Sequence, residues 1–237
     1  MNLDPVGAFA RARDEVLGRI AAAATRAGRD PETVTLVGVS KTQPPDVVQA
    51  AIDAGVTVLG ENRVQEAVVK VTGTHGGTWH LIGPLQANKA RRALETVDVI
   101  QSVDSLDLAR RLDRIVAENS AGTAFPVLLQ VNVADDPAKA GFAPDAVDAV
   151  LDELLDLEHL RVDGLMTIGT LVADPESARP TFGALRDLAT RLRARDTRLG
   201  PELSMGMTAD YEVAVEEGAT IVRVGRALFG ERPAPRA

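Results

Sequence analysis

The stretch VTLVGVSKTQ, residues 34–43, joins a β-branched apolar run to a serine, a lysine and further polar residues. Apolar runs of this length are typical of strands that are buried on both faces, as in parallel sheets. Seven further runs follow: VTVLGEN (56–62), WHLIG (79–83), VDVIQSV (97–103), FPVLLQVNV (125–133), VDGLMTIG (162–169), ELSMG (202–206) and TIVRVG (220–225). The sequence therefore predicts eight buried strands.

Stretches with helical spacing of apolar residues lie between these runs. Two clear examples are Leu108, Leu112, Ile115 and Val116, which follow a cap-like Asp104-Ser105, and Phe182, Leu185, Ala189 and Leu192. Eight strand–helix units in about 250 residues predict a single (β/α)8 barrel, an α/β fold. An open doubly wound sheet has the same alternation but typically fewer strands.

The two ends of the chain lie outside this repeat. Residues 5–27 place Phe9, Ala12, Val16 and Ile20 on one face and end at Gly28, so we expect an extra N-terminal helix within residues 1–30. The polar, proline-containing segment 231–237 is expected to be a flexible tail. No linker or low-complexity tract divides residues 1–237, which predicts one domain.

Composition excludes several classes of protein. The absence of cysteine among 237 residues excludes disulfides, thiolate metal sites and a cysteine nucleophile, and it fits a reducing compartment. No apolar run approaches the roughly 18 residues of a membrane span. The N-terminal MNLDPVGAF also lacks the order of a secretory signal, so we expect a cytoplasmic protein without a membrane partner. A net charge of −8 without a basic run argues against nucleic acid.

Lysine is scarce in this chain, and one lysine occupies a special place. Only four of the 26 cationic residues are lysines, namely Lys41, Lys70, Lys89 and Lys139. Barrel active sites form at the carboxyl ends of the strands, and Lys41 directly follows the first run. An amine in such surroundings can attack a carbonyl, so Lys41 is a candidate Schiff-base residue. A solvated lysine beyond a strand end is the alternative.

The ends of the last two runs are candidates for a phosphate site. SMGMT, residues 204–208, is expected to open a helix after the seventh run, and Gly225-Arg226 follows the eighth. These two loops are the recurrent phosphate site of (β/α)8 barrels, because glycines let backbone amides approach the oxygens. Thr208 as a simple helix N-cap is the alternative.

Two further polar residues lie within expected strands. Alternation in TIVRVG puts Arg223 either inside the barrel or beneath the helices, where its charge needs a partner. That partner is a cofactor ring nitrogen or a buried carboxylate. His80 is interpreted as a core or supporting residue, and the histidine and acidic spacings predict no metal site.

Seven blocks, in order, resemble the pyridoxal phosphate homeostasis protein family. They are VGVSKTQP around Lys41, GENRVQE from Gly60, WHLIGPLQANK, QVNVADDPAKAGF, GLMTIG, LSMGMTADYEVAVEEG and VRVGRALFG, and they span residues 37–230. Each block alone is a weak signal, but seven in order are highly specific. Lys89 and Lys139 also fall within these blocks, whereas Lys70 is left as a chance retention.

The resemblance implies a barrel like the N-terminal domain of alanine racemase, of fold type III among pyridoxal 5′-phosphate (PLP) proteins. It implies PLP as an internal aldimine on Lys41. It further implies that Ser204, Gly206 and Thr208, with the backbone of Gly225 and Arg226, hold the phosphate. Arg223 would approach the pyridine nitrogen, and Asn62, His80 and Met166 would lie around the ring. Thr208 stands where many members have serine, which keeps the hydroxyl.

Carrier and enzyme remain alternatives at this point. An arginine at the pyridine nitrogen makes the ring a weaker electron sink. The sole tyrosine, Tyr211, has no clear route to the ring. Only 12 residues follow Gly225 in the sequence, so we expect no counterpart of the separate C-terminal domain of racemases. We therefore expect a PLP carrier in vitamin B6 homeostasis, with no assigned catalytic residue and PLP-dependent apo-enzymes as recipients.

Two rival functions are open. The first is an amino-acid racemase or other PLP enzyme; the second, outside the family, is a Schiff-base aldolase for phosphorylated sugars. We expect a monomer or a weak homodimer.

Overall fold

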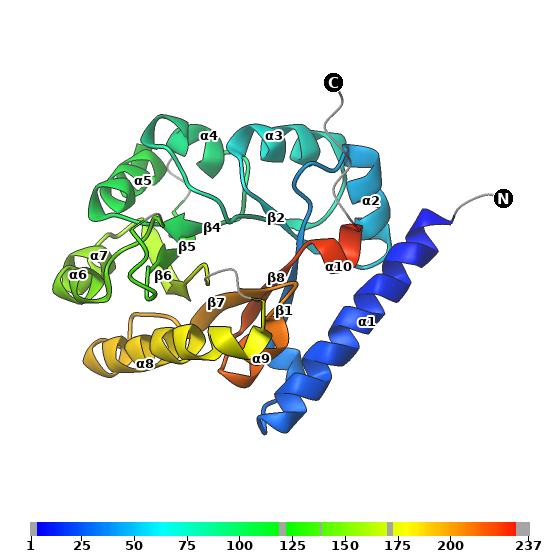
Figure 1. Ribbon diagram of the computed structural model, residues 1–237. Helices are drawn as coiled ribbons and strands as arrows, with labels where there is room; N and C mark the ends of the chain where they lie inside the picture. The colour runs from blue at the N-terminus through cyan, green and yellow to red at the C-terminus, as the bar shows by residue number, and fades with distance from the viewer. Residues whose placement is uncertain (1–3, 119–121, 138, 170–172, 231–237) are drawn as a thin grey trace.

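The computed structural model describes residues 4–118, 122–137, 139–169 and 173–230. Within them, eight parallel strands follow one another around a closed barrel, and the last strand pairs with the first. Figure 1 shows the strands enclosed by a ring of helices. The expected (β/α)8 barrel is confirmed, and the open sheet is ruled out by the pairing of β1 with β8.

The strands match the eight expected runs. They are β1 Thr35–Val39, β2 Val58–Glu61, β3 Thr78–Leu81, β4 Val99–Val103, β5 Phe125–Gln130, β6 Leu160–Met166, β7 Glu202–Met207 and β8 Ile221–Val224. One boundary bears on the site. The segment 204–208 does not open a helix as expected, because β7 continues through Met207 and the next helix begins at Tyr211.

Helices connect consecutive strands and cover the barrel. They are α1 Pro5–Arg26, α2 Pro45–Asp53, α3 Val64–Gly73, α4 Ala90–Leu94, α5 Leu106–Glu118, α6 Pro144–Ala149, α7 Leu151–Leu155, α8 Arg179–Arg195, α9 Tyr211–Glu216 and α10 Arg226–Phe229, with short 3-10 turns at Pro31–Thr33, Ala87–Lys89 and Pro175–Ala178. Among the described residues, no helix combines the length and apolarity needed to cross a membrane.

The extra N-terminal helix is present as α1. Asp4 caps it by accepting a hydrogen bond from the Gly7 amide, and Pro5 occupies its first turn. Val16 and Ile20 are buried as expected, and α1 packs outside the helix ring against α2, α9 and α10 (Figure 1). The expected tail at 231–237 lies outside the described residues.

The core has two parts. The larger lies between strands and helices and contains the two helical stripes, including Leu112 and Phe182. The smaller fills the inside of the barrel with Val37, Leu128, Met166 and Ile221. The cavity that the described residues form lies at the mouth, above these side chains.

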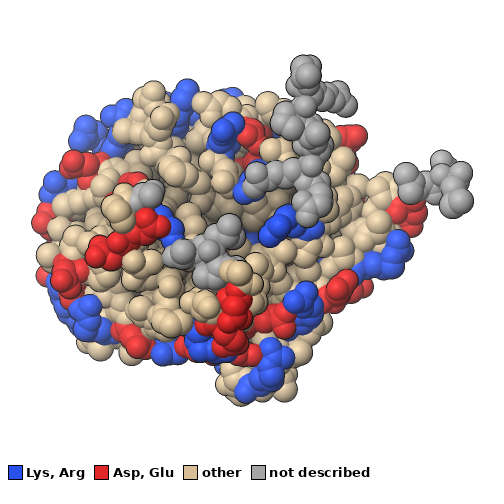
Figure 2. Space-filling model, in the orientation of Figure 1, with Lys and Arg blue, Asp and Glu red and all other residues tan. Residues whose placement is uncertain are grey.

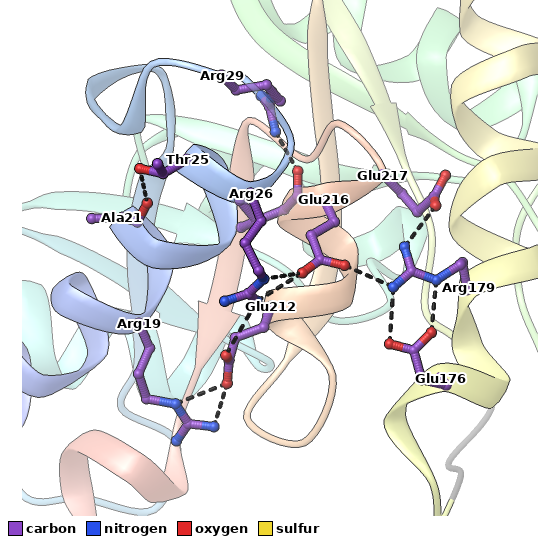
Figure 3. Close-up of polar contacts among 11 residues, drawn as sticks. Arg19, Ala21, Thr25, Arg26, Arg29, Glu176, Arg179, Glu212, Glu216 and Glu217 are labelled. Atoms are coloured by element: carbon purple, nitrogen blue, oxygen red, sulfur yellow. Dashed lines mark hydrogen bonds and ion pairs between the residues drawn. The ribbon is translucent and has the colours of Figure 1, made fainter.

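Arginine–carboxylate pairs link neighbouring helices on the outside. Figure 3 shows Arg179 of α8 bonded to Glu216 at the end of α9, to Glu217 directly after it, and to Glu176 in the turn before α8. Arg26 of α1 reaches Glu216 as well, so α1, α8 and α9 are joined in one network. Similar pairs join α4 to α5, α5 to α7, and α6 and α7 to α8. This accounts for part of the arginine excess.

Candidate functional site

A cavity of about 620 Å³ opens at the carboxyl ends of the strands. Figure 2 shows this face hollowed near its centre, with cationic side chains beside the hollow. The polar lining comprises Lys41, Gln43, Asn62, Thr208, Asp210, Arg223, Gly225 and Arg226, and the larger apolar side chains are Val39, Ile82, Ile168, Met207 and Phe229. The structure thus brings together six of the ten expected site residues.

Lys41 lies in a tight turn directly after β1. The carbonyl of Ser40 accepts a hydrogen bond from the Gln43 amide at 3.0 Å, which closes the turn. Thr42 adopts a φ of 68°, a conformation that costs energy for a β-branched residue. The half-buried Lys41 side chain lines the cavity, while Ser40 points to the opposite side of the strand and is fully buried.

A buried ion pair lies behind this turn. Glu61, at the end of β2, is fully buried and pairs with Lys70 of α3 through its Oε1. Burial raises the pKa of Glu61, and the bonds from Lys70 and Ser40 act in the opposite direction. The other carboxylate oxygen, Oε2, is buried without a hydrogen-bond partner among the described residues. On the sequence alone, Lys70 is interpreted as a lysine retained by chance. The structure instead places it inside the protein, in an ion pair.

The loops after β7 and β8 meet at the cavity. The hydroxyl oxygen of Thr208 accepts a hydrogen bond from the Gly225 amide at 3.2 Å. Gly206 turns the chain here with a φ of +89°, and a Cβ at this position would lie 2.5 Å from the Cβ of Ala214. The N-cap residue of α9 is Asp210, so Thr208 is not the N-cap that the alternative interpretation required.

Arg223 points into the barrel mouth, which settles its orientation. Its side chain donates from Nη1 to Oγ of Ser204 at 2.6 Å and from Nη2 to the carbonyl of Thr167 at 2.8 Å. Burial lowers the pKa of Arg223 to about 10, partly offset by the charge of Asp210, so the guanidinium stays charged at neutral pH. Its direct partners are thus a hydroxyl and a carbonyl, with Asp210 acting only at longer range.

A hydrogen-bond chain continues from Arg223 across the barrel. Because arginine only donates, the Ser204 hydroxyl accepts from it and donates onward to Oε1 of Gln101 at 2.6 Å. The amide nitrogen of Gln101 lies 2.6 Å from Nδ1 of His80, which must then be the acceptor. Burial lowers the pKa of His80 to about 4, so the ring is neutral and carries its proton on Nε2.

Four expected site residues lie outside the cavity lining. Ser204 is fully buried in this hydrogen-bond chain, and His80 ends the same chain. Met166 belongs to the interior cluster beneath the mouth, where Ile168 lines the cavity instead. Gly206 shapes the turn that carries Thr208. These four support the cavity from behind or below.

Sequence reasoning missed Asp210, Gln101, Glu61 and Lys70. Asp210 is buried, lines the cavity and accepts a hydrogen bond from the Met207 amide at 2.6 Å. Burial raises its pKa. A usable signal existed for Lys70, because it lies three residues after Ala67 and six after Val64, on the buried face of α3.

Tyr211 lies away from the cavity. Its ring is buried beneath the guanidinium of Arg19 from α1, 5.4 Å from the ring centroid, and it is absent from the cavity lining. Within the described residues, the lining contains no tyrosine, histidine or cysteine. Lys41 and Asp210 are consequently the side chains there that are suited to proton transfer.

The sequence and the fold match known proteins over most of the chain. Residues 16–233 match the sequence model of the alanine racemase N-terminal domain. The pyridoxal phosphate homeostasis protein of Aquifex aeolicus is 42% identical over 219 residues, which cover 92% of this chain and 95% of that protein. The chain belongs to the pyridoxal phosphate homeostasis protein family. The family resemblance of the seven sequence blocks is confirmed.

Solved structures share the fold of this chain. PipY from Synechococcus elongatus, solved with PLP bound, is 41% identical with a TM-score of 0.78, covering 89% of this chain and 100% of PipY. PipY without PLP gives 42% identity and a TM-score of 0.80. An alanine racemase from Clostridium difficile, 16% identical with a TM-score of 0.70, is covered over only 60% of its length. That likeness shows the shared barrel alone.

Proposed function

We propose that this protein binds PLP at the barrel mouth through Lys41 and takes part in PLP homeostasis. The observation that carries the proposal is that Lys41 lines the same cavity as the loops after β7 and β8. These loops supply the Thr208 hydroxyl and the Arg226 guanidinium. The PLP bound to PipY and the names of the curated relatives support it.

The residues present fit this cofactor. PLP needs an amine for its aldehyde, donors for a phosphate dianion and an apolar slot for its ring. Lys41 offers the amine, and the Thr208 hydroxyl and the Arg226 guanidinium offer donors beside the backbone of Gly225. Ile82 and Ile168 provide apolar walls between them.

Each residue then has a role. Lys41 holds the cofactor as a Schiff base, formed by condensation of its amine with the aldehyde and loss of water. The Thr208 hydroxyl and Arg226 bind the phosphate beside Gly225, whose amide holds the Thr208 oxygen in place, and Arg223 donates to the pyridine nitrogen. Asn62 contacts the ring side of the cavity. Ser204 supports Arg223 rather than the phosphate, because its hydroxyl is already committed on both sides.

The site favours a carrier over an enzyme. Bound PLP withdraws electrons from a substrate carbon most strongly when its ring nitrogen is protonated, and a charged arginine opposes that protonation. A racemase also needs a second proton-transfer group opposite the lysine. Asp210 is the one candidate in the described lining, and its carboxylate accepts the Met207 amide. An amino-acid racemase therefore remains the second candidate function.

Two assays separate these functions. The loaded protein is mixed with a PLP-dependent apo-enzyme, whose recovered activity reports transfer, and separately with amino acids in D2O, where NMR reports exchange of the Cα proton. A carrier restores the apo-enzyme without rapid exchange. Exchange at enzymatic rates that is lost in Asp210→Asn would instead establish the racemase. Delivery to apo-enzymes, a monomeric or weakly dimeric state and a cytoplasmic location belong to the carrier proposal.

A further inference from the structure

The helix α3 contacts the backbone on both sides of Lys41. From within the fold, Nζ of Lys70 donates to the carbonyl of Ser40 at 2.6 Å. From the surface, the carboxylate of Glu66 accepts the amide of Thr42 at 3.2 Å. Glu66 and Lys70 are one helical turn apart, so one face of α3 contacts both Ser40 and Thr42, the residues before and after Lys41.

The inner contact is fixed by a closed set of bonds. Ser40 Oγ donates to Oε1 of Glu61 at 2.5 Å, and the same oxygen pairs with Lys70. Ser40 also donates its amide to the Gly60 carbonyl at 3.2 Å, which continues the β1–β2 ladder. Side chain, amide and carbonyl of Ser40 are therefore all held by β2 and α3.

This arrangement bears directly on the direction of Lys41. The Ser40 carbonyl belongs to the peptide plane that joins Ser40 to Lys41, and it accepts from both Lys70 and Gln43. Fixing this plane fixes the direction in which the Lys41 side chain leaves the turn. The unfavourable φ of Thr42 persists only where the surroundings overdetermine it, and the α3 contacts supply that constraint.

We propose that the buried Glu61–Lys70 pair and Glu66 are positioning residues that aim Lys41 at the aldehyde of an incoming PLP. The inference deepens the proposed function and rests on it. Loss of the pair does not change the phosphate-binding loops after β7 and β8. The Lys41 side chain, however, is no longer held in the orientation from which its amine attacks the aldehyde. A misplacement of about 1 Å in such a step costs on the order of a hundredfold in rate.

The test uses the apo-protein and the rate of Schiff-base formation, followed by visible absorbance at increasing PLP. The double variant Glu61→Leu/Lys70→Met replaces the buried pair by apolar side chains, a change that proteins often tolerate in stability. The surface variant Glu66→Ala removes only the outer contact. Arg63→Gln is the control at the N-cap of α3, because Arg63 is exposed and pairs with Glu66, and no hydrogen bond or ion pair joins it to residues 40–43 within the described chain.

We expect the saturating rate to fall at least tenfold in the double variant and about threefold in Glu66→Ala. The half-saturating PLP concentration and the inhibition by inorganic phosphate stay unchanged, and Arg63→Gln behaves as the parent protein. Hydrogen exchange of the Thr42 and Gln43 amides becomes faster in both test variants, a readout that needs no cofactor.

A parental rate and parental amide protection in either folded variant would overturn the positioning role. If the double variant does not fold, Glu66→Ala decides the matter alone. Failure of the parent protein to form a borohydride-stable adduct on Lys41 would refute the proposed function itself, which distinguishes the two failures.

Discussion

The guanidinium of Arg223 is held by the hydroxyl of Ser204, at 2.6 Å from Nη1 to Oγ. The partner is neutral, so the positive charge of Arg223 is not cancelled by direct contact with a carboxylate. A charged donor at the cavity wall stabilises an unprotonated ring nitrogen. This relationship is the structural basis for expecting PLP storage and weak carbon-acid chemistry.

Ser204→Ala should weaken both the fold and the site. It leaves Oε1 of Gln101 and one N–H of Arg223 buried without partners, at a cost of about 1–3 kcal/mol in the free energy of unfolding. Urea unfolding measures the loss, and PLP titration should show weaker binding. Ser102→Ala is the control, since Ser102 is equally buried but bonds the Gly83 carbonyl. Equal PLP affinity in both variants would contradict the role of Ser204.

The buried, neutral His80 should make the free energy of unfolding depend on pH. Its pKa is about 4 when folded and near 6.5 when unfolded, so the unfolded chain binds the extra proton between these values. The His80 contribution therefore makes stability fall as the pH drops from 6.5 to 4, by about 3 kcal/mol in total. His80→Asn keeps an acceptor for Gln101 and should lose this part of the slope. Identical pH profiles of unfolding free energy would show that His80 is not the neutral acceptor.

Gly206→Ala should destabilise the protein by about 2 kcal/mol or more. The added methyl meets Ala214, and the positive φ is unfavourable for alanine. Because Gly206 sets the turn before Thr208, PLP affinity should fall as well.

Gly18→Ala should instead raise the free energy of unfolding. This helical glycine has open space around it, and alanine should stabilise α1 by about 0.5–1 kcal/mol. Thermal unfolding of both variants checks the pair.

Arg179→Gln should cost about 0.5–1 kcal/mol at low salt. Arg179 joins three glutamates at the junction of α8 and α9, yet it is partly exposed, so water and salt screen these pairs. The difference from the parent protein should shrink in 1 M NaCl. Arg193→Gln on the same helix, where the described residues provide no ion-pair partner, should change little. A salt-independent difference would point to packing by the arginine stem.

The strands were predictable because each coincides with a short, mostly apolar run of the sequence. The extra helix was predictable because Phe9, Val16 and Ile20 keep helical spacing to Gly28. The cavity lining was partly predictable because the carboxyl ends of all the strands meet at the barrel mouth. The residues that this brings together are Lys41, Asn62, Thr208, Arg223, Gly225 and Arg226.

It was harder to predict whether a side chain lies at the barrel mouth or inside the barrel. Strand β7 extends to Met207, which lifts Thr208 to the mouth and leaves Ser204 inside the barrel. Ser204, Gln101 and His80 come from β7, β4 and β3, so their contact depends on barrel closure. No local pattern encodes it. Glu61 and Lys70 likewise meet only once α3 folds back on β2.

Covalent binding of PLP to Lys41 is tested by borohydride reduction of the PLP-treated protein, followed by peptide mass mapping. We expect one stable adduct, on Lys41, and no adduct in a Lys41→Ala variant that remains folded by circular dichroism. An adduct confined to Lys70, Lys89 or Lys139, or no adduct at saturating PLP, would contradict it.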